Sequence, residues 1–252
     1  MKILLICAGD RSKYSIALNS IKHIKKTKLD QITVCVLDNN KKIIKYLKDN
    51  KIKYIYKNID NFFKKIKKNE YSWLLNIWGY RILKKDFLKK FNNNLNLHPA
   101  YLPYNRGRDP YYFSIINKTP IGICIHKMDE TIDGGKYYLR KRFHLKFPVN
   151  AGTIFDICLK GIRDMFTKNW INIRNSKIRL KKIPNKINKI NKRKELILNN
   201  FVDLDKKKNK ANKSFVLNCI GQDFDFLKLQ VKLFGKIYDC KISLKRSKKK
   251  IW

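Results

Sequence analysis

The sequence predicts an α/β fold, with a doubly wound, mostly parallel sheet followed by a small β-containing C-terminal module. The first observation is that short apolar runs alternate with segments of helical periodicity up to residue 98. The second is that these runs are continuously apolar, as in strands that are buried on both faces. The third is that Lys, Asn and Ile dominate residues 174 to about 213, which sets off a C-terminal part with alternating segments.

The N-terminal part begins with the unit strand, helix, strand. The apolar runs "KILLICA" (2–8) and "QITVCVLD" (31–38) predict two strands. Between them, apolar residues recur at helical spacing from Ile16 to Ile24, after Ser12 as a candidate N-cap. The same alternation predicts helices near 40–50, 59–68 and 84–91, and strands at 53–56, 72–78 and 94–98.

The following residues predict two more strands and two helices. Asp109 and Pro110 open a short helix over 109–117. Strands are expected at 120–129 and 135–145, and the strongest helical period in the chain lies over 151–173.

We expect the chain to divide into a domain over 1–177, a Lys/Asn-rich linker over 178–213 and a small β module over 214–252. Two alternating segments within 226–246 flank "FGK" and predict a hairpin.

The charge balance is extreme, because 59 Lys and Arg against 19 Asp and Glu give a formal net charge of +40. Such a field attracts RNA, phosphorylated metabolites and acidic membranes alike. The excess is mostly Lys and is scattered from end to end, whereas an RNA-binding surface would cluster Arg and aromatic residues on one element. The pattern therefore favours a general compositional bias.

The six cysteines indicate a reducing compartment. They are widely spaced, without a C-x-x-C pair or a neighbouring His at metal-ligand spacing, so we expect free thiols, no metal site and a cytoplasmic protein. Nowhere do about 18 apolar residues follow one another, and we expect neither a signal peptide nor a membrane span.

Asn96 and His98 are the first candidates for chemistry. Their spacing of two puts both on one face of the strand at 94–98, which ends at Pro99. In open α/β sheets, ligands bind at the carboxyl ends of the strands. The alternative interpretation is a structural histidine at a strand end.

A second candidate is the acidic loop "MDETIDGG" at 128–135. It holds Asp129, Glu130 and Asp133 in a chain that is otherwise poor in acids, with a solvated turn as the alternative. A carboxylate from this loop close to His98 would fix the imidazole tautomer and favour its protonated form.

Together, "NLHPAYLPYNRGRDPYYFSIIN" and "PIGICIHKMDETIDGG" resemble the signature of the folate-dependent formyltransferases. That family includes glycinamide ribonucleotide formyltransferase, methionyl-tRNA formyltransferase and the sugar N-formyltransferases. The resemblance is strongest over about 72–140 and implies a Rossmann-like catalytic domain. It also implies transfer of a formyl group from 10-formyltetrahydrofolate to a primary amine, without a metal.

The resemblance implies a catalytic site made of Asn96, His98 and Asp133. The Asn96 amide suits the oxyanion of the tetrahedral intermediate, and His98 suits proton transfer. Asp133 would orient His98 and help to take the proton from the amine.

The same resemblance implies the binding surfaces. The segment around "NIWGYRIL" would cradle the pterin, with a facing wall after Pro99 and a contribution from the acidic loop. The candidate folate residues are Ile77, Trp78, Gly79, Tyr80, Ile82, Leu83, Tyr101, Leu102, Pro103 and Asp129. The candidate acceptor residues are Gly9, Arg11, Ser12, Asn105, Arg106 and Gly107.

Two positions depart from the family pattern D-E-G-x-D-T-G. Thr131 replaces a glycine, which costs turn flexibility, and Gly134 replaces a threonine, which removes a hydroxyl near Asp133. The three expected catalytic residues are intact.

Three amine acceptors compete. The segment "HPAYLPYNRGRDPYYFSI" is most similar to the sugar N-formyltransferases, which favours a nucleotide-linked amino sugar. Initiator methionyl-tRNA is the alternative, because the positive charge suits RNA. Glycinamide ribonucleotide is less favoured, because its phosphate-binding loop appears only as "AGDRSKY".

Two further expectations stay open at this point. One is a non-catalytic RNA-binding protein on the same fold, which would be favoured if Asn96, His98 and Asp133 failed to converge in space. The other is a homodimer, with the C-terminal hairpin as its contact.

Overall fold

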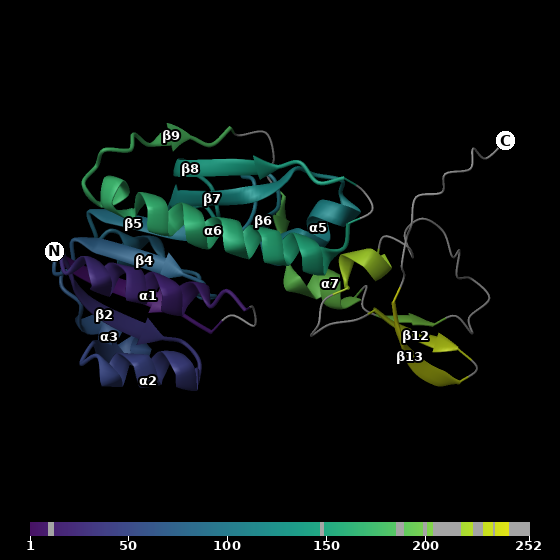
Figure 1. Ribbon diagram of the computed structural model, residues 1–252, viewed down its shortest axis with the longest axis horizontal. Coiled ribbons are helices and arrows are strands. Elements are labelled where there is room, and N and C mark those ends of the chain that lie inside the picture. The colour runs from purple at the N-terminus through teal and green to yellow at the C-terminus, as the bar shows by residue number, and fades with distance from the viewer. Residues whose placement is uncertain are drawn as a thin grey trace.

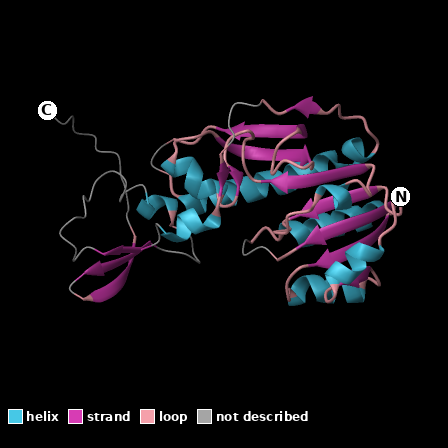
Figure 2. Cartoon of the chain, turned by 180° about the vertical axis from the view of Figure 1, so that it is seen from behind, coloured by secondary structure: helices cyan, strands magenta, loops and turns pink. Residues whose placement is uncertain are grey.

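A computed structural model of the chain describes residues 1–9, 13–146, 149–184, 189–198, 201–203, 218–223, 229–233 and 235–241. One large sheet is flanked by helices, and the longest of them, α6 (Ala151–Arg174), runs along it (Figure 1). A three-stranded sheet near the C-terminus stands apart from the large sheet, as the view from behind shows (Figure 2).

The large sheet has eight strands in the order β3-β2-β1-β4-β5-β7-β8-β9. The strands β1 to β5 are parallel to one another, whereas β7, β8 and β9 pair antiparallel at the other side. The predicted mostly parallel α/β fold is thereby confirmed. The bounds are β1 Lys2–Cys7, β2 Gln31–Val36, β3 Lys53–Ile55, β4 Trp73–Ile77, β5 Asn93–His98, β7 Ile121–Lys127, β8 Lys136–Phe143 and β9 Lys181–Lys182.

Helices cover both faces of this sheet, which explains its continuously apolar strands. On β1, Ile3 and Leu5 belong to a core cluster with residues of α1, α2 and α6. The alternate residues Leu4 and Ile6 pack in a second cluster with residues of α3 and α4. Successive side chains of a strand point to opposite faces, so both sets must be apolar. The helices are α1 Ile16–Thr27, α2 Lys41–Asp49, α3 Ile59–Lys65, α4 Lys85–Leu88, α5 Pro110–Ile116 and α7 Arg193–Leu198.

The first helix begins later than a cap at Ser12 would require. α1 starts at Ile16, its N-cap is Ser15, and the Ser15 side chain makes no capping hydrogen bond. Ser12 itself lies outside the described residues. At α6 the Asn150 side chain does cap, because it accepts a hydrogen bond from the Thr153 N–H at 2.8 Å.

The described part of the predicted linker packs against the first domain. β9 pairs with β8, and β10 (Ile190–Asn191) pairs with β6 (Arg106–Gly107). Ile183 and Leu196 are buried at 2% and 1% exposure. These two buried apolar side chains attach a segment that is otherwise rich in Lys and Asn, and the average composition of the segment does not show this.

The C-terminal part is joined to the first domain by a short helical segment at 218–221. The backbone N–H of Gly152, in α6, donates to the Asp223 carbonyl at 3.0 Å. Further along, β12 (Leu229–Leu233) and β13 (Lys236–Cys240) pair antiparallel around the "FGK" segment, as predicted, and β11 (Phe201–Asp203) pairs with β12.

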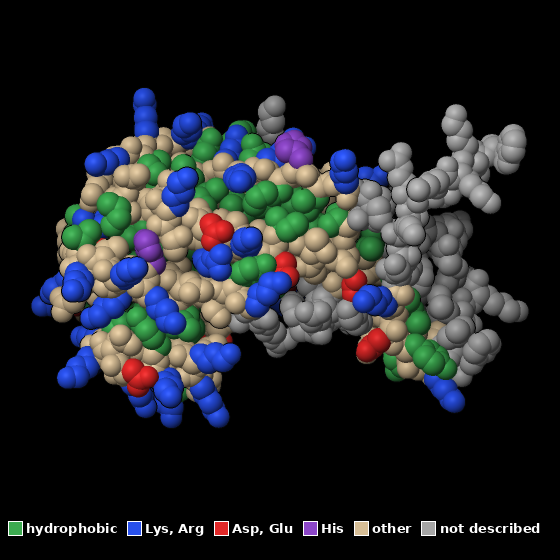
Figure 3. All heavy atoms as spheres, in the orientation of Figure 1, with side chains coloured by type: hydrophobic (Ala, Val, Ile, Leu, Met, Phe, Trp, Pro, Cys, Tyr) green, Lys and Arg blue, Asp and Glu red, His purple; other side chains and the backbone are tan. Residues whose placement is uncertain are grey.

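Lys and Arg side chains are spread over the face seen in Figure 3 and do not gather over one element. Among the described residues, none of the helices has the length and apolarity that crossing a membrane requires. The six cysteines are free thiols. In the part of the chain that the structure describes, no group of three or more His, Cys, Asp and Glu side chains is arranged to hold a metal ion.

Candidate active site

A cavity of about 910 Å³ opens at the carboxyl ends of β1, β4 and β5. Strand order reverses between β1 and β4, since β2 and β3 follow on one side of β1 and β4 lies on the other. Gly9 after β1, Gly79 after β4 and His98 at the end of β5 all line the cavity. Its position at a topological switch point is where open α/β sheets bind ligands.

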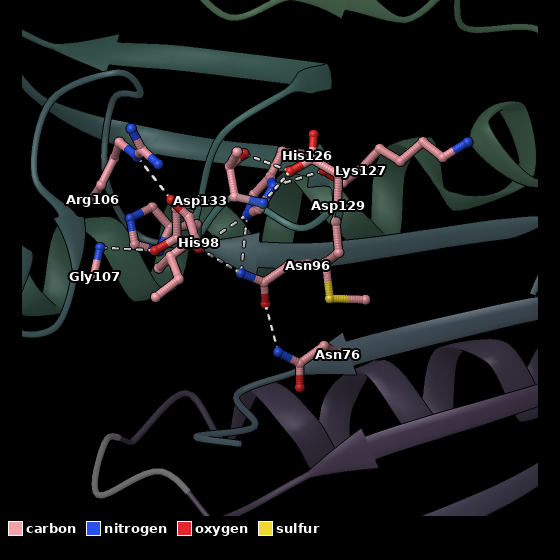
Figure 4. A network of polar contacts seen from close by, with 12 residues as sticks. Asn76, Asn96, His98, Arg106, Gly107, His126, Lys127, Asp129 and Asp133 are labelled. Carbon is pink, nitrogen blue, oxygen red and sulfur yellow. Dashed lines mark hydrogen bonds and ion pairs between the residues drawn. The ribbon is translucent and has the colours of Figure 1, made fainter. Parts of the chain in front are cut away.

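A row of polar side chains crosses three neighbouring strands beside the cavity. Asn96 on β5 lies opposite Asn76 on β4 and opposite His126 on β7 in the strand register. Side chains that lie opposite one another share a face of the sheet, so the three groups meet (Figure 4).

The contacts of Asn96 fix the direction of its amide. Asn76 Nδ2 donates to Asn96 Oδ1 at 3.0 Å, so the Asn96 oxygen faces β4. Asn96 Nδ2 therefore faces the opposite way, 3.0 Å from His126 Nε2 and 3.4 Å from Asp133 Oδ1.

The hydrogen bonds of the His126 ring agree with this direction of the Asn96 amide. Its Nδ1 lies 3.1 Å from the Lys127 carbonyl oxygen, which can only accept, so Nδ1 carries the hydrogen. In the neutral ring, Nε2 is then the acceptor for the Asn96 amide. The Asn96 N–H groups are thus held at the cavity side of the row.

His98 has its basic nitrogen directed toward Asp133. Its Nε2 lies 3.3 Å from the Asn105 carbonyl oxygen and donates to it. This leaves Nδ1 with the lone pair in the neutral ring, 3.6 Å from Asp133 Oδ2. A proton taken up at Nδ1 would therefore face a carboxylate.

As expected, the Asp133 carboxylate favours the protonated form of His98, but burial of the imidazole acts against it. His98 is 5% exposed. Burial lowers the pKa of His98 below its usual 6.5, and the opposing effect of the Asp133 charge is the smaller of the two. His98 is thus neutral at pH 7 and available as a base.

Asp133 is held as a carboxylate. Burial by itself would raise its pKa, but His98, His126 and the Gly107 N–H hold the pKa of Asp133 well below its ordinary value. Gly107 N donates to Asp133 Oδ2 at 2.8 Å. The Asp133 backbone is in the left-handed region, with φ 48°, as in a tight turn. The Asp133 side chain lies toward β5 and β7 from this turn.

The two departures from the family pattern fit one another in the acidic loop. The Thr131 hydroxyl donates to Asp129 Oδ1, and Thr131 Oγ1 lies 2.2 Å from the place that a Cβ at Gly134 would take. A side chain at position 134 would collide with Thr131. Thr131 thus occupies the space that a side chain at position 134 would take.

The predicted folate residues divide into two groups. Trp78, Gly79, Tyr80, Ile82, Leu83 and Asp129 line the cavity. Ile77 is fully buried in the core. A Cβ at Gly79 would lie 2.1 Å from Asn76 Oδ1, so the absence of a side chain there leaves space for Asn76.

Tyr101, Leu102 and Pro103, predicted as the facing wall, are not among the residues that line the cavity. Leu102 packs with Cys124 and Ile183 instead. Arg140 donates to the Leu102 carbonyl at 2.8 Å, and its guanidinium lies 4.7 Å from the Tyr101 ring centre. These contacts turn the loop away from the cavity.

The predicted acceptor residues are also separated by the structure. Gly9 and Gly107 line the cavity, whereas Arg11 and Ser12 lie outside the described residues. Asn105 uses its amide to donate to Ser114 at 2.8 Å and Thr119 at 2.7 Å. Arg106 Nε donates to the Ile132 carbonyl at 2.8 Å, which holds the acidic loop.

Sequence reasoning missed Asn76, His126 and a second wall of the cavity formed by residues 190–193 and 196. The histidine in "GICIHKMD" was a signal for His126, but its partner depends on strand register. No sequence signal indicated residues 190–196, because they lie in the segment predicted as a linker.

The arrangement combines a neutral buried imidazole, a carboxylate and an oriented amide beside one cavity. These groups can take a proton from an attacking nucleophile and donate hydrogen bonds to a developing oxyanion. Such a set fits acyl-type transfer.

Comparison with known proteins finds similarity in the middle of the chain. A family model described as "Formyl transferase" matches residues 61–154. A dTDP-4-amino-4,6-dideoxyglucose formyltransferase from Mycobacterium tuberculosis is 29% identical over 80 residues, which are 32% of this chain and 34% of that protein. A methionyl-tRNA formyltransferase from Orientia tsutsugamushi is 36% identical over 81 residues, 31% of this chain and 26% of that protein. The match thus spans about a third or less of the length of these curated relatives.

Solved structures match over nearly the whole chain. A 4-N formyltransferase from Francisella tularensis superposes with a TM-score of 0.77 at 24% identity and covers 98% of both chains. An N-formyltransferase from Helicobacter canadensis, in complex with folinic acid and dTDP-3-aminofucose, gives 0.73 at 22% identity, over 93% of this chain and 85% of that one. At these identities the likeness shows a shared fold.

Proposed function

We propose that this chain, whose residues 61–154 match the formyl transferase family model, transfers a formyl group from 10-formyltetrahydrofolate to the amino group of a nucleotide-linked amino sugar. The observation that carries the proposal is that Asn96, His98 and Asp133 lie together beside one cavity, with Asp133 contacting both other residues. A non-catalytic protein on the same fold would have no need of this arrangement.

His98 and Asp133 would handle the proton. The acceptor amine attacks the formyl carbon, a C–N bond forms, and the amine must lose one proton. His98 Nδ1 takes it, either directly or through a water, and Asp133 stabilises the resulting imidazolium. The proton then goes to the nitrogen that leaves as the formyl C–N bond of the folate breaks, so protons balance over the cycle.

Asn96 would stabilise the oxyanion. Its amide N–H groups already face the cavity side of the polar row, and the 3.4 Å contact to Asp133 is the weaker of the two that they make. A formyl oxygen that gains negative charge can replace this weaker acceptor. Because Asn76 holds the Asn96 carbonyl, the donor needs no reorganisation during the reaction.

The cavity fits a folate in size and composition. Cavities that bind small molecules typically have volumes of roughly 300 to 1,000 Å³ with mostly apolar walls and a few polar groups. Here Trp78, Ile82 and Leu83 supply apolar wall, and Asp129 lies on the other side in the acidic loop. The folate supplies the activated formyl group, and these residues would bind and orient its pterin.

An amino-sugar acceptor is supported by two likenesses. The relative from M. tuberculosis is named for a dTDP-linked amino sugar, and the H. canadensis structure contains dTDP-3-aminofucose with folinic acid.

The test is a direct formylation assay. The protein is incubated with 10-formyltetrahydrofolate and, in separate reactions, a panel of dTDP- and UDP-linked amino sugars, charged initiator tRNA and glycinamide ribonucleotide. We expect a formylated sugar nucleotide, detected by mass spectrometry, and its loss in His98→Ala but not in Asn172→Asp, an exposed position on α6. Absence of product from every sugar would contradict the proposal.

Initiator methionyl-tRNA is the second candidate acceptor. The net charge of +40 and the match to the O. tsutsugamushi enzyme favour it. Product from tRNA alone would establish it in place of the sugar. Cytoplasmic location and a homodimer through the C-terminal hairpin stay predictions.

A further inference from the structure

The cavity has a second wall that lies outside the residues matched by the family model. β10 brings Ile190 and Asn191 beside β6, so that Asn191 pairs with Gly107. The Asn191 carbonyl accepts a hydrogen bond from the Arg108 N–H at 3.0 Å. Gly107 has φ +90°, and a Cβ there would lie 2.4 Å from the Asn191 oxygen, so glycine is required for this approach.

Two polar side chains, Asn191 on this wall and Asp109 just before α5, lack a complete set of partners among the described residues. Asn191 is 4% exposed, and its Nδ2 has no acceptor. Asp109 Oδ2 is buried without a donor. Both residues line the cavity. Because buried polar atoms without partners are costly, each indicates a place that a ligand group completes.

The Asp109 carboxylate is fixed in place but is not used by the fold. It precedes α5 as the N-cap residue, yet its side chain makes no capping hydrogen bond. Its other oxygen, Oδ1, lies 3.3 Å from Arg193 Nη1, which holds the side chain against the wall. Burial raises the pKa of Asp109, against the smaller opposing effects of Arg193 and Arg108, so a donor at Oδ2 would relieve an unfavourable environment.

We propose that Asn191 and Asp109 form the acceptor subsite and together bind a hydroxyl group of the sugar. This inference rests on the proposed function and deepens it. A hydroxyl is the group that suits the pair, because it accepts from the Asn191 amide and donates to the Asp109 carboxylate at the same time. A phosphate would meet repulsion from Asp109, and an ammonium would find no use for the Asn191 donor.

The subsite would decide which amine is formylated. Asn96 and His98 act on any amine that reaches the formyl carbon, so they do not distinguish acceptors. Binding a hydroxyl at a defined place on the opposite wall would orient the sugar ring and thereby select the position of its amino group.

The test uses two isosteric substitutions. Asn191→Asp replaces the donor by an acceptor, and Asp109→Asn replaces an acceptor oxygen by a donor. With the sugar nucleotide that the wild-type protein accepts, each should raise KM by about tenfold or more, the range of a hydrogen bond to a charged or buried group. The kcat at saturation and the affinity for tetrahydrofolate should stay within about twofold, as in the matched control Asn172→Asp.

The double variant Asn191→Asp/Asp109→Asn identifies the ligand group. A hydroxyl can reverse its direction, so exchanging donor and acceptor should restore part of the lost affinity, measured by calorimetric titration of the sugar nucleotide. No recovery would contradict a hydroxyl, since a rigid donor or acceptor cannot reverse.

The outcomes separate this inference from the proposed function. If the wild-type protein formylates no sugar, the proposed function fails. If it does and both single variants keep the wild-type KM, the subsite alone is overturned. Should Asn191→Asp not fold, as judged by circular dichroism, Asp109→Asn decides, and a wild-type KM for that variant overturns the proposal.

Discussion

The cavity has two walls that are built in different ways. The strand wall, formed by Asn76, Asn96, His98 and His126, comes from neighbouring strands inside the eight-stranded sheet. The downstream wall, formed by Asn191, Lys192 and Arg193, depends on the two residue pairs between β6 and β10 and on one ion pair. The strand wall is therefore fixed by the core, whereas the downstream wall can change without disturbing the sheet.

This difference teaches how one fold can keep a reaction and vary its substrate. The groups suited to proton transfer and oxyanion binding lie where strand register holds them together. The groups suited to recognising an acceptor come from a segment with little regular structure. Substitutions in the strand wall should lower kcat for every acceptor, and substitutions in the downstream wall should raise KM for particular ones.

His98→Ala tests the strand wall most severely. Removing a general base typically lowers the rate by about 10² to 10⁴. We expect kcat to fall by that factor with every acceptor, while the affinity for tetrahydrofolate changes little. Single-turnover kinetics and calorimetry measure the two quantities, and retention of full turnover would remove His98 from the chemistry.

Asn76→Asp tests whether the direction of the Asn96 amide matters. The new carboxylate cannot donate to Asn96 Oδ1, so the Asn96 amide should lose its fixed direction. Loss of one oxyanion donor costs about 10² to 10³ in kcat. The KM of the acceptor should not change, and the side-chain amide resonance of Asn96 should shift. An unchanged kcat would show that Asn76 has no positioning role.

The pH dependence tests the environment of His98. Because burial lowers the pKa of His98 in the folded protein, the neutral base persists below pH 6.5. The acid limb of kcat/KM should lie below that pH, with about a tenfold loss for each unit below the limb. Folding stability should also decline as pH falls below 6.5, since the unfolded chain then binds a proton that folded His98 resists. An acid limb above pH 6.5 would contradict this account.

Arg193→Gln should give the smallest effect and lies in the downstream wall. Its partner Asp109 is 17% exposed and Arg193 is 46% exposed, so the ion pair is worth about 1 kcal/mol or less. We expect the KM of the sugar to rise about two- to fivefold with kcat unchanged. The effect should shrink at high salt. A fall in kcat without a change in KM would place Arg193 with the strand wall.

Much of the strand wall was predictable from residue patterns. Periodicity located the strands, and the N-x-H spacing at Asn96 and His98 put both side chains on one face. The acidic loop was recognised as the source of the carboxylate. Asn76 and His126 were not predicted, because each is opposite Asn96 only in the register of three strands that are distant in sequence.

The downstream wall could not be predicted in this way. Residues 190–196 lie in a stretch whose average composition is that of a linker. Their position at the cavity depends on two buried side chains: Ile183 packs with Leu102 and Cys124, and Leu196 packs with Tyr112 and Phe113. For Tyr101 and Leu102 the sequence predicted a place at the cavity that the structure does not give them. They follow the catalytic strand directly, yet Arg140 holds their loop away from the cavity.

The sequence by itself determined the mostly parallel α/β sheet, the strand end that carries Asn96 and His98, and the loop that carries Asp133. Local periodicity and side-chain alternation are properties of neighbouring residues, so they can be seen in the chain. Only the tertiary structure decided that His98 is buried with Nδ1 directed toward Asp133, that Asn76 orients Asn96, and that Asn191 lines the cavity. Burial, strand register and the approach of β10 to Gly107 each depend on residues far apart in sequence, and no local pattern records them.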